Sequence, residues 1–321
     1  MRIVIHGQQA FGRAVLEKLL ARDAADEQII AVCTAPEQPG KADDPLKALA
    51  LEHDLPVHQP ASWKTPEALA LMQSFNADVC MMAYVLLFVP EAVLNAPRLG
   101  SFQYHPSLLP MHRGPSSINW PIALGATETG LSIFWPNDGL DEGPILLQKT
   151  CAIGADETLG DVYFNKLFPL GVDAMLESLD LVKAGDAPRI AQDLTAGSYE
   201  SWFGKAQAEV DWTQPTQTVY NIIRAANPQP GAWTTHAGAR LSIFDSELIA
   251  GGDGAGGASG DGAGGAGAGK PGEVLTVDDN GITVAAVDGA IRIKRVRADA
   301  GKIPAAEYAA AANLKPGEQL G

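Results

Sequence analysis

The sequence has few cysteines and no long apolar run. Its three cysteines, Cys33, Cys80 and Cys151, are isolated from one another and form no metal-binding pair. This usage predicts reduced thiols rather than a disulfide framework or a zinc site. No apolar run approaches the ~20 residues of a membrane helix, and the first residues, MRIVIHG, are typical of a strand rather than of a signal peptide. We therefore expect a cytoplasmic protein with no membrane partner.

Positive charge is also scarce. The chain has 23 Lys and Arg against 38 Asp and Glu, which gives a formal net charge of −15 at pH 7. Such a charge disfavours binding to polyanions such as tRNA unless basic residues gather locally. The one basic cluster in the sequence is Arg292, Lys294, Arg295 and Arg297. Solvated charges on an edge strand account for this cluster better than an RNA site does.

Two common cofactor motifs are incomplete. The turn GQQAFG at residues 7–12 has Gln9 in place of the middle glycine that lets a pyrophosphate approach the backbone. Gly12 is not followed by Lys-Ser or Lys-Thr, so a phosphate-binding P-loop is lacking too. His105 and His112 are seven residues apart across a proline-containing loop, without an acidic residue at helical spacing. We predict no NAD, no ATP and no metal.

The first two hundred residues alternate short apolar runs with helical patterns. This alternation predicts an α/β fold with a Rossmann-like, mostly parallel sheet. One helix is expected at about residues 13–22, and another at 158–184, which Pro169 should break or kink. The predicted strands are residues 2–5, 29–33, 56–58, 78–83, 101–105, 130–135 and 145–148.

The sequence pattern changes towards the carboxyl end, where short alternating segments replace the helical patterns. We predict an N-terminal domain at residues 1–189, a linker at 190–204 and a second domain at 205–321. Short alternating strands favour a small β-barrel for the second domain, and they are expected at 232–236, 239–249, 281–287 and 290–296. The tract 251–270 is nearly all Gly, Ala, Asp and Ser, which predicts a flexible loop between two strands of the barrel.

A histidine and a carboxylate are the best candidates for chemistry. His105 ends the predicted strand 101–105, and Asp141 lies in a Gly-Leu-Asp-Glu-Gly turn. We expect both at the carboxyl ends of parallel strands, where open α/β sheets place ligands. An Asp beside a His fixes the orientation of the imidazole and favours its charged form. The apolar segment 83–90 is expected to pack in the core, and it also suits a flat aromatic ligand such as a pterin.

At these residues the chain resembles the folate-dependent formyltransferase family. The family includes methionyl-tRNA formyltransferases, sugar formyltransferases and the hydrolase domain of 10-formyltetrahydrofolate dehydrogenase. The likeness rests on HPSLLP at residues 105–110, Arg113-Gly114 and GLDEGP at 139–144. Asp211-Trp212 and PGAW at 230–233 resemble the family's C-terminal domain. Segments 39–46, 61–64 and 118–120 are most similar to the hydrolase domain.

The resemblance implies an enzyme that uses 10-formyltetrahydrofolate. It implies formyl transfer to an amine, or hydrolysis to tetrahydrofolate and formate, at a site where His105 and Asp141 are catalytic. It also implies that the N-terminal domain carries folate binding and catalysis, and that the second domain is an OB-like barrel. The implied folate-binding residues are Met82, Tyr84, Leu86, Phe88, Ser107, Leu108, Leu109, Pro110, Asn137, Asp138 and Gly139.

Gln103 departs from the family pattern. Transferases of the family carry an asparagine two residues before the catalytic histidine, and the dehydrogenase domain carries an aliphatic residue there. Gln103 offers the same amide as asparagine on a longer stem, and we include it as a third catalytic candidate. Two alternatives stay open: a methionyl-tRNA formyltransferase acting on initiator tRNA, and a folate-binding protein without turnover. The acceptor (water, a small amine, a sugar amine or methionyl-tRNA) and the oligomeric state are also open.

Overall fold

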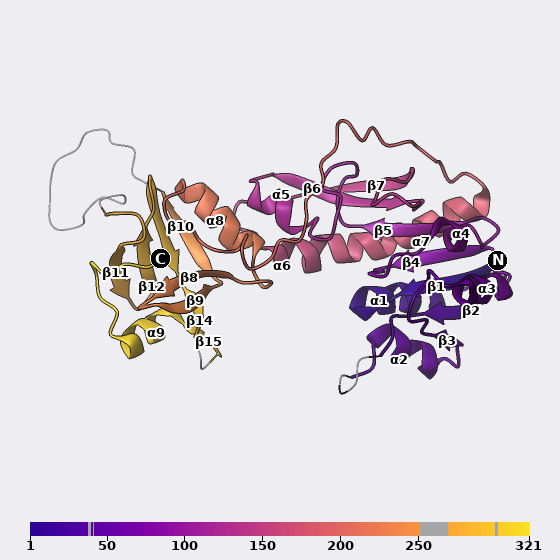
Figure 1. Ribbon diagram of the computed structural model, residues 1–321, viewed down its shortest axis with the longest axis horizontal. Coiled ribbons are helices and arrows are strands. Elements are labelled where there is room, and N and C mark those ends of the chain that lie inside the picture. Colours follow the sequence, from indigo (N-terminus) through magenta and orange to yellow (C-terminus); the bar gives the residue numbers. More distant parts are fainter. Residues whose placement is uncertain (38–39, 41, 251–268, 299–300) are drawn as a thin grey trace. The chain divides into compact units, whose positions relative to one another are not determined.

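A computed structural model describes the chain except for residues 38–39, 41, 251–268 and 299–300 (Figure 1). The loop predicted at 251–270 therefore lies almost entirely outside the described residues. The chain forms two compact units, and each contains three stretches of sequence. The first unit comprises Met1–Ser117, Thr129–Ala152 and Phe164–Glu200, and the second Ile118–Glu128, Ile153–Tyr163 and Ser201–Gly321. The domain boundaries expected from the sequence stay a prediction.

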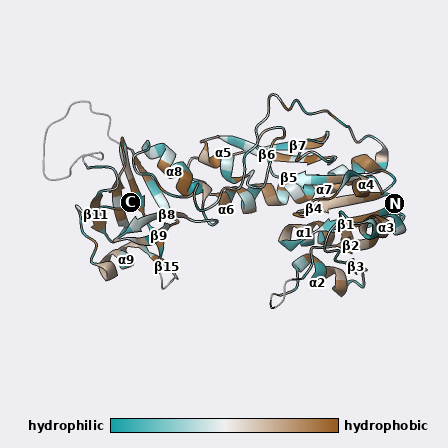
Figure 2. Cartoon of the chain, viewed as in Figure 1, coloured by the Kyte–Doolittle hydropathy of each residue, from teal (hydrophilic) through white to brown (hydrophobic). Residues whose placement is uncertain are grey.

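A seven-stranded sheet organises the first unit, in the order β3-β2-β1-β4-β5-β6-β7. The strands from β3 to β5 pair in parallel, and β6 pairs antiparallel with β5. Their bounds are β1 Arg2–Gly7, β2 Gln28–Cys33, β3 Val57–His58, β4 Val79–Ala83, β5 Ser101–His105, β6 Glu128–Phe134 and β7 Ile145–Ala152. The predicted α/β fold with a mostly parallel sheet is confirmed. Figure 2 shows that apolar residues follow the strands, and all of β4 is buried.

The expectation that Asp141 follows a parallel strand is wrong. β6 runs antiparallel to β5, with Ser132 opposite His105. The connection between these strands contains one short helix, α5 (Asn119–Ala123), which is too short to cover the sheet as a crossover helix does in a parallel pair. The loop after β6 nevertheless returns Asp141 to His105, as described below.

Helices cover both faces of the sheet. On one face, Phe11 of α1 stacks on Tyr104 of β5, with ring centroids 4.2 Å apart. Gly171 of α7 lies against the same tyrosine ring. On the other face, residues of α3 and α4 pack against Cys80 and Met82 of β4. The helices of this unit are α1 Gln9–Leu20, α2 Pro45–Glu52, α3 Pro66–Ser74, α4 Glu91–Leu94 and α7 Phe168–Ala184.

The helix predicted at 158–184 runs without a gap from Leu159 to Ala184, and it is distorted just before Pro169 rather than broken there. The chain forms α6 (Leu159–Val162), a π-helical turn at Tyr163–Leu167 and then α7. Pro169 occupies the first turn of α7. Because Pro169 has no backbone N–H, it cannot make the regular hydrogen bond of an α-helix, and the π-helical turn that precedes it accommodates this lack.

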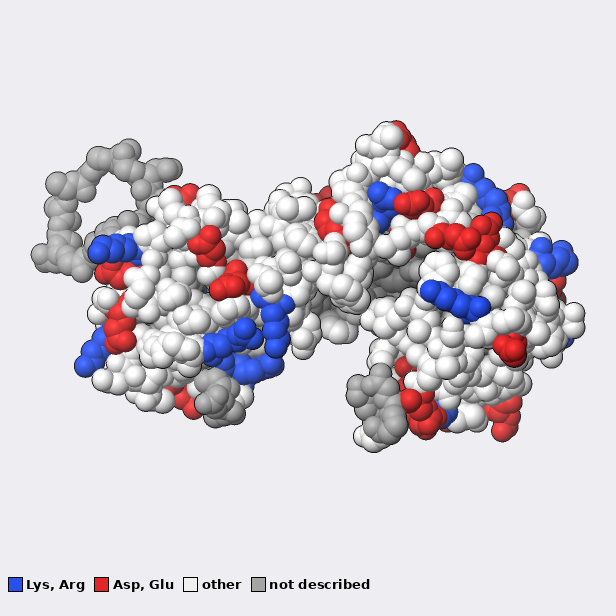
Figure 3. Space-filling view, viewed as in Figure 1, with Lys and Arg blue, Asp and Glu red and all other residues white. Residues whose placement is uncertain are grey.

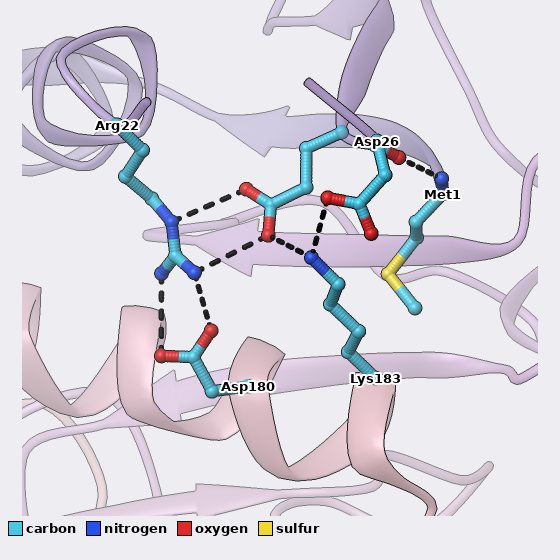
Figure 4. Close-up of polar contacts among 6 residues, drawn as sticks. Met1, Arg22, Asp26, Asp180 and Lys183 are labelled. Atoms are coloured by element: carbon cyan, nitrogen blue, oxygen red, sulfur yellow. Dashed lines mark hydrogen bonds and ion pairs between the residues drawn. The ribbon is translucent and has the colours of Figure 1, made fainter. Parts of the chain in front are cut away.

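An ion-pair network fixes α7 against the end of α1 and the start of β2 (Figure 4). Arg22 contacts Asp180 of α7 and Glu27, and its Nε lies 3.2 Å from a Glu27 oxygen. Lys183 reaches Asp26 at 2.8 Å and Glu27 at 3.1 Å. The hydrogen bond from Lys183 lowers the pKa of the Asp26 carboxyl. Glu27, which is only 5% exposed, is the carboxylate that Arg22 and Lys183 share, whereas the pairs with Asp26 and Asp180 are exposed and contribute little individually.

The second unit contains two antiparallel four-stranded sheets, β10-β13-β12-β11 and β15-β14-β9-β8. The strands are β8 Ala232–His236, β9 Ala239–Ile243, β10 Ser246–Ala250, β11 Val274–Asp278, β12 Gly281–Ala285, β13 Gly289–Ile293, β14 Arg295–Ala298 and β15 Gly301–Pro304. The helices α8 (Thr216–Ala225) and α9 (Ala305–Ala312) pack against these strands. Antiparallel strands are thus confirmed for this part of the chain, and the closed OB-like barrel stays a prediction.

Two stretches predicted as single strands each form two. The run 239–249 divides into β9 and β10, and the run 290–296 divides at Lys294 into β13 and β14. At the breaks, Lys294 donates its N–H to the Asp245 carbonyl (2.8 Å) and Phe244 donates to Arg295 (3.0 Å). The chain passes from one sheet to the other there, which an unbroken apolar pattern does not reveal.

The basic cluster seen in the sequence is divided between these two sheets. Arg292 and Lys294 pair with Glu247, at 3.9 and 2.7 Å. Arg297 and Lys302 instead lie over the ring of Phe244, at 4.9 and 3.8 Å from its centroid. Figure 3 shows Lys and Arg side chains gathered on the second unit. Among the described residues, no helix is long and apolar enough to span a membrane.

His6 is an ionisable residue in the core of the first unit. It is the last but one residue of the buried strand β1, and its ring lies 4.7 Å from that of Trp63. Its Nδ1 has no hydrogen-bond partner among the described residues. Burial lowers the pKa of His6 from 6.5 to about 3, so the side chain is neutral at physiological pH.

This burial predicts an acid-sensitive fold. Between pH 6.5 and about 3, the unfolded chain binds a proton at residue 6 that the folded chain does not. The stability that neutral His6 contributes is fully present above pH 6.5. As the pH falls from 6.5 towards about 3, the free energy of unfolding decreases by about 1.4 kcal/mol per pH unit. In urea unfolding from pH 7 to 5, His6→Ile should weaken this dependence, whereas His53→Asn at an exposed histidine should retain it. Equal slopes for wild type and His6→Ile would contradict the assignment.

Candidate active site

β5 presents two of the candidate catalytic side chains on one face of the sheet. Side chains alternate along a strand, so Gln103 and His105 lie on the face opposite Tyr104. Gln103 is opposite Met82 in the register with β4. His105 is 6% exposed, and its ring meets the ring of Phe134 edge-on at 6.5 Å. The histidine therefore occupies a fixed, largely apolar position at the end of the strand.

Asp141 approaches His105 from the loop between β6 and β7. Its Oδ2 lies 3.7 Å from His105 Nδ1, and its side chain is 10% exposed. The same Oδ2 accepts a hydrogen bond from the backbone N–H of Gly114 (2.9 Å). The structure thus brings together the histidine and the carboxylate that the sequence singled out. The 3.7 Å separation exceeds a direct hydrogen bond, so Asp141 acts on His105 here through its charge.

Gly114 permits this contact because of its backbone geometry. Its φ is +108°, and a Cβ atom at this position would lie 2.4 Å from the Glu200 carbonyl oxygen. A side chain would therefore suffer both strain and collision. Its neighbour Arg113 bonds Glu142 at 2.7 Å, which fixes the turn beside Asp141. Gln192 donates to the Asp141 carbonyl (2.9 Å) and holds the same loop from another side.

An apolar wall lies beside the pair, in the segment after β4. Tyr84, Leu86 and Phe88 are 42%, 61% and 49% exposed. The intervening Val85 and Leu87 pack against the core. The predicted folate-binding residues of this segment are thus its outward members, available to a ligand. Exposed apolar side chains that alternate with buried ones are typical of a binding surface.

The other predicted folate residues have different environments. Ser107 is fully buried, and its hydroxyl donates to a backbone carbonyl within the loop (2.7 Å). Leu109 is also buried, whereas Leu108 and Pro110 are half-buried. The Ser107 hydroxyl and the Leu109 side chain therefore maintain the shape of the loop. A contact of Ser107 or Leu109 with folate would have to use their backbone atoms, and this contact stays a prediction.

Two residues of the loop after β6 fix the shape of this loop and join it to the helix that follows the apolar wall. Asn137 Oδ1 accepts the Gly139 N–H (3.0 Å), which forms a turn. Asp138 Oδ1 accepts the N–H of Glu91, the first residue of α4 (2.9 Å). This contact joins the Asp141 loop to the helix that follows the wall segment. Their predicted folate contacts also stay a prediction.

Several residues at the site were missed in the sequence. Gln192, Ser198 and Glu200 belong to the stretch interpreted as a linker, and they contact the two loops through backbone groups or single polar atoms. Nothing in the local sequence around these residues indicates that they make these contacts. Within the described part of the chain, no group of three or more His, Cys, Asp or Glu side chains is placed to hold a metal ion.

Together, these observations define a class: an α/β domain with a strand-end histidine beside a loop carboxylate. Comparison with known proteins identifies the family. A formyl transferase family model matches residues 1–178, and a model of the formyl transferase C-terminal domain matches residues 203–313. The chain belongs to the formyl transferase family, a family of enzymes. The resemblance inferred from the sequence motifs is confirmed.

Two relatives show how the likeness extends over the chain. Cytosolic 10-formyltetrahydrofolate dehydrogenase of Xenopus tropicalis is 36% identical over 315 residues, which cover 96% of this chain and 34% of the relative. Methionyl-tRNA formyltransferase of Geobacter sulfurreducens is 34% identical over 327 residues, which cover 100% and 97%. The chain spans about a third of the length of the dehydrogenases. These similar identities do not assign a particular member of the family.

Solved structures share the fold. HypX from Aquifex aeolicus in complex with tetrahydrofolic acid has a TM-score of 0.63 at 20% identity and covers 96% of this chain and 47% of that one. The N-formyltransferase from Helicobacter canadensis, in complex with folinic acid and dTDP-3-aminofucose, has a TM-score of 0.64 at 17% identity, with coverage of 91% and 98%.

The geometry at Gly114 predicts a sharp effect of adding one methyl group. Gly114→Ala should reduce turnover at least tenfold and destabilise the first unit by roughly 1–3 kcal/mol, because strain and collision displace the Asp141 contact. Gly185→Ala is the matched control, because Gly185 also has a positive φ (+80°) but nothing lies within 4 Å of its added Cβ. Unfolding curves and turnover should separate the two variants. Equal turnover in both would show that the Gly114 contact is dispensable.

Proposed function

We propose that this protein transfers the formyl group of 10-formyltetrahydrofolate to an amine or to water. The observation that carries the proposal is the placement of His105 and Asp141, 3.7 Å apart and both largely buried, in a chain of the formyl transferase family. The exposed side chains of Tyr84, Leu86 and Phe88 supply an apolar surface for the pterin ring. Two of the compared proteins support the choice of donor: a relative is named a 10-formyltetrahydrofolate dehydrogenase, and the structural neighbour HypX was solved in complex with tetrahydrofolic acid.

The residues fit a two-step acyl transfer. The amine or water attacks the formyl carbon, and a tetrahedral intermediate with a negatively charged oxygen forms. His105 and the Gln103 amide are the hydrogen-bond donors for this oxygen, and one such donor is typically worth ~3 kcal/mol. The attacking amine or water gives up a proton to the His105–Asp141 pair. The bond from the formyl carbon to N10 then breaks, and this proton passes to N10, which gives tetrahydrofolate. Asp141 stabilises the imidazolium that exists while His105 carries a proton.

Removal of either member of the pair should abolish most turnover. His105→Ala and Asp141→Asn should each lower kcat by roughly 10²–10⁴-fold, because each removes part of the proton-transfer machinery. Tetrahydrofolate release from 10-formyltetrahydrofolate measures this effect, with formate measured in parallel to separate hydrolysis from transfer. Asp186→Asn, at an exposed carboxylate, is the control and should match wild type. Wild-type rates in both site variants would refute the site.

Variants of Gln103 test whether its amide takes part in turnover. Its side chain is half-buried and lies on the same face of β5 as His105, where its amide can meet a ligand. Gln103→Leu should lower kcat by about 10²-fold with little change in KM, because a donor to the oxyanion acts only in the transition state. Gln103→Asn retains the amide and should keep more of the rate. If Leu and Asn variants are equally active, the amide has no role in turnover.

A further inference from the structure

A stretch of chain far away in sequence lies alongside the catalytic loop. Ser198 donates its N–H to the Pro110 carbonyl (3.1 Å) and accepts the Arg113 N–H at its own carbonyl (3.1 Å). Glu200 donates its backbone N–H to the Arg113 carbonyl (3.1 Å). The Ser198 hydroxyl also accepts the His112 N–H (2.9 Å). Residues 198–200 thus form a short ladder with residues 110–113, and we call residues 197–200 the bracing segment.

The close approach of the bracing segment is built into the backbone. A Cβ atom on Gly197 would lie 2.4 Å from the Pro110 carbonyl oxygen. This distance is well below any real Cβ contact, so only glycine allows the segment to begin where it does. The ladder therefore reflects a specific fit between the segment and the loop.

The bracing segment also holds the side chain of His112. His112 Nδ1 lies 3.2 Å from Glu200 Oε2, with the two side chains 14% and 17% exposed. The backbone of His112 is in the left-handed region, with φ at +54°. Such a conformation is uncommon for a residue with a Cβ and persists only where surrounding contacts enforce it. Glu200 and the Ser198 hydroxyl are the contacts that do so.

The conformation of His112 determines where its carbonyl points. That carbonyl oxygen lies 3.1 Å from Nε2 of His105. Because a carbonyl only accepts, Nε2 must carry a hydrogen. Neutral His105 then has its lone pair at Nδ1, the atom 3.7 Å from Asp141 Oδ2. The His112 carbonyl thereby assigns proton uptake and release to Nδ1, and His105 donates to the formyl oxygen from Nδ1 once this atom carries a proton.

We propose that Glu200 and His112 are positioning residues that set the tautomer of His105. The chain of contacts runs from Glu200 to the His112 ring, through the strained His112 backbone, and from its carbonyl to His105 Nε2. This inference rests on the proposed function for its kinetic consequence. Neither Glu200 nor the His112 ring reaches the reacting atoms, so both act through His105.

Kinetics of Glu200 variants test the consequence for turnover. Glu200→Ala should lower kcat about tenfold with KM within twofold, because the catalytic group is misplaced while the folate surface is intact. Glu200→Gln keeps an acceptor for a His112 Nδ1–H and should recover most of the loss. Asp186→Asn controls for the loss of one negative charge. A change in KM alone, or no change in kcat, would overturn the proposal.

Nitrogen-15 NMR of the imidazole rings tests the tautomer without any turnover. The chain has six histidines, and the His105→Gln spectrum identifies the His105 signals. At pH 8, wild-type His105 should show a protonated Nε2 and a bare Nδ1. Glu200→Ala should convert this to a mixture of tautomers, and so should His112→Ala, which removes the ring contact that holds the positive φ at residue 112.

These two measurements separate the inference from the proposed function. Wild-type protein that does not turn over 10-formyltetrahydrofolate, but shows the tautomer change in Glu200→Ala, would refute the function and support the positioning role. An unchanged His105 tautomer in both variants would overturn the positioning role whatever the rates. Thermal unfolding of each variant checks that the first unit stays folded. If Glu200→Ala unfolds, the His112→Ala spectrum decides.

Discussion

The candidate site depends on one hydrogen bond, from the Gly114 N–H to Asp141 Oδ2 at 2.9 Å. It joins two loops that leave different strands, and both residues have positive φ angles, +108° and +56°. Because one carboxylate oxygen is held by the backbone, its position relative to His105 does not depend on a flexible side chain. The Arg113–Glu142 pair and the Gln192 contacts maintain the loops around this bond. Without it, the histidine would lack a fixed negative charge.

The sequence predicts the central part of this arrangement because the signals are local. Alternation of apolar runs and helical patterns predicts the α/β fold, and strand 101–105 is predicted with the bounds that the structure has. His105 and Asp141 stand out because glycine and proline surround them. The direction of β6 could not be predicted in this way, because an apolar run has the same composition whichever way the strand runs. Only the length of helix in the connection before it indicates an antiparallel pair, and α5 is too short to be read from the sequence.

The supporting contacts could not be predicted for a physical reason. The bracing segment acts through backbone groups, which every residue possesses, and through two single polar side chains, those of Ser198 and Glu200, so its composition resembles that of any surface turn. The Ser107 hydroxyl illustrates the converse, because a polar residue in a promising motif is used inside the loop. In the segment after β4, the expectation that residues 83–90 pack in the core is wrong for Tyr84, Leu86 and Phe88, which are exposed, because a uniformly apolar run does not show which of its side chains face outward. Sequence thus indicates the reacting groups better than the contacts that orient them.

The central claim is that His105 and Asp141 act as one unit on the formyl group. A double-mutant cycle on kcat with 10-formyltetrahydrofolate tests it most directly, using His105→Ala, Asp141→Asn and the double variant. Residues that act as a unit are strongly non-additive, so the double variant should be no more than about threefold slower than His105→Ala. If the two single losses instead multiply in the double variant, the two residues act independently and the account is wrong.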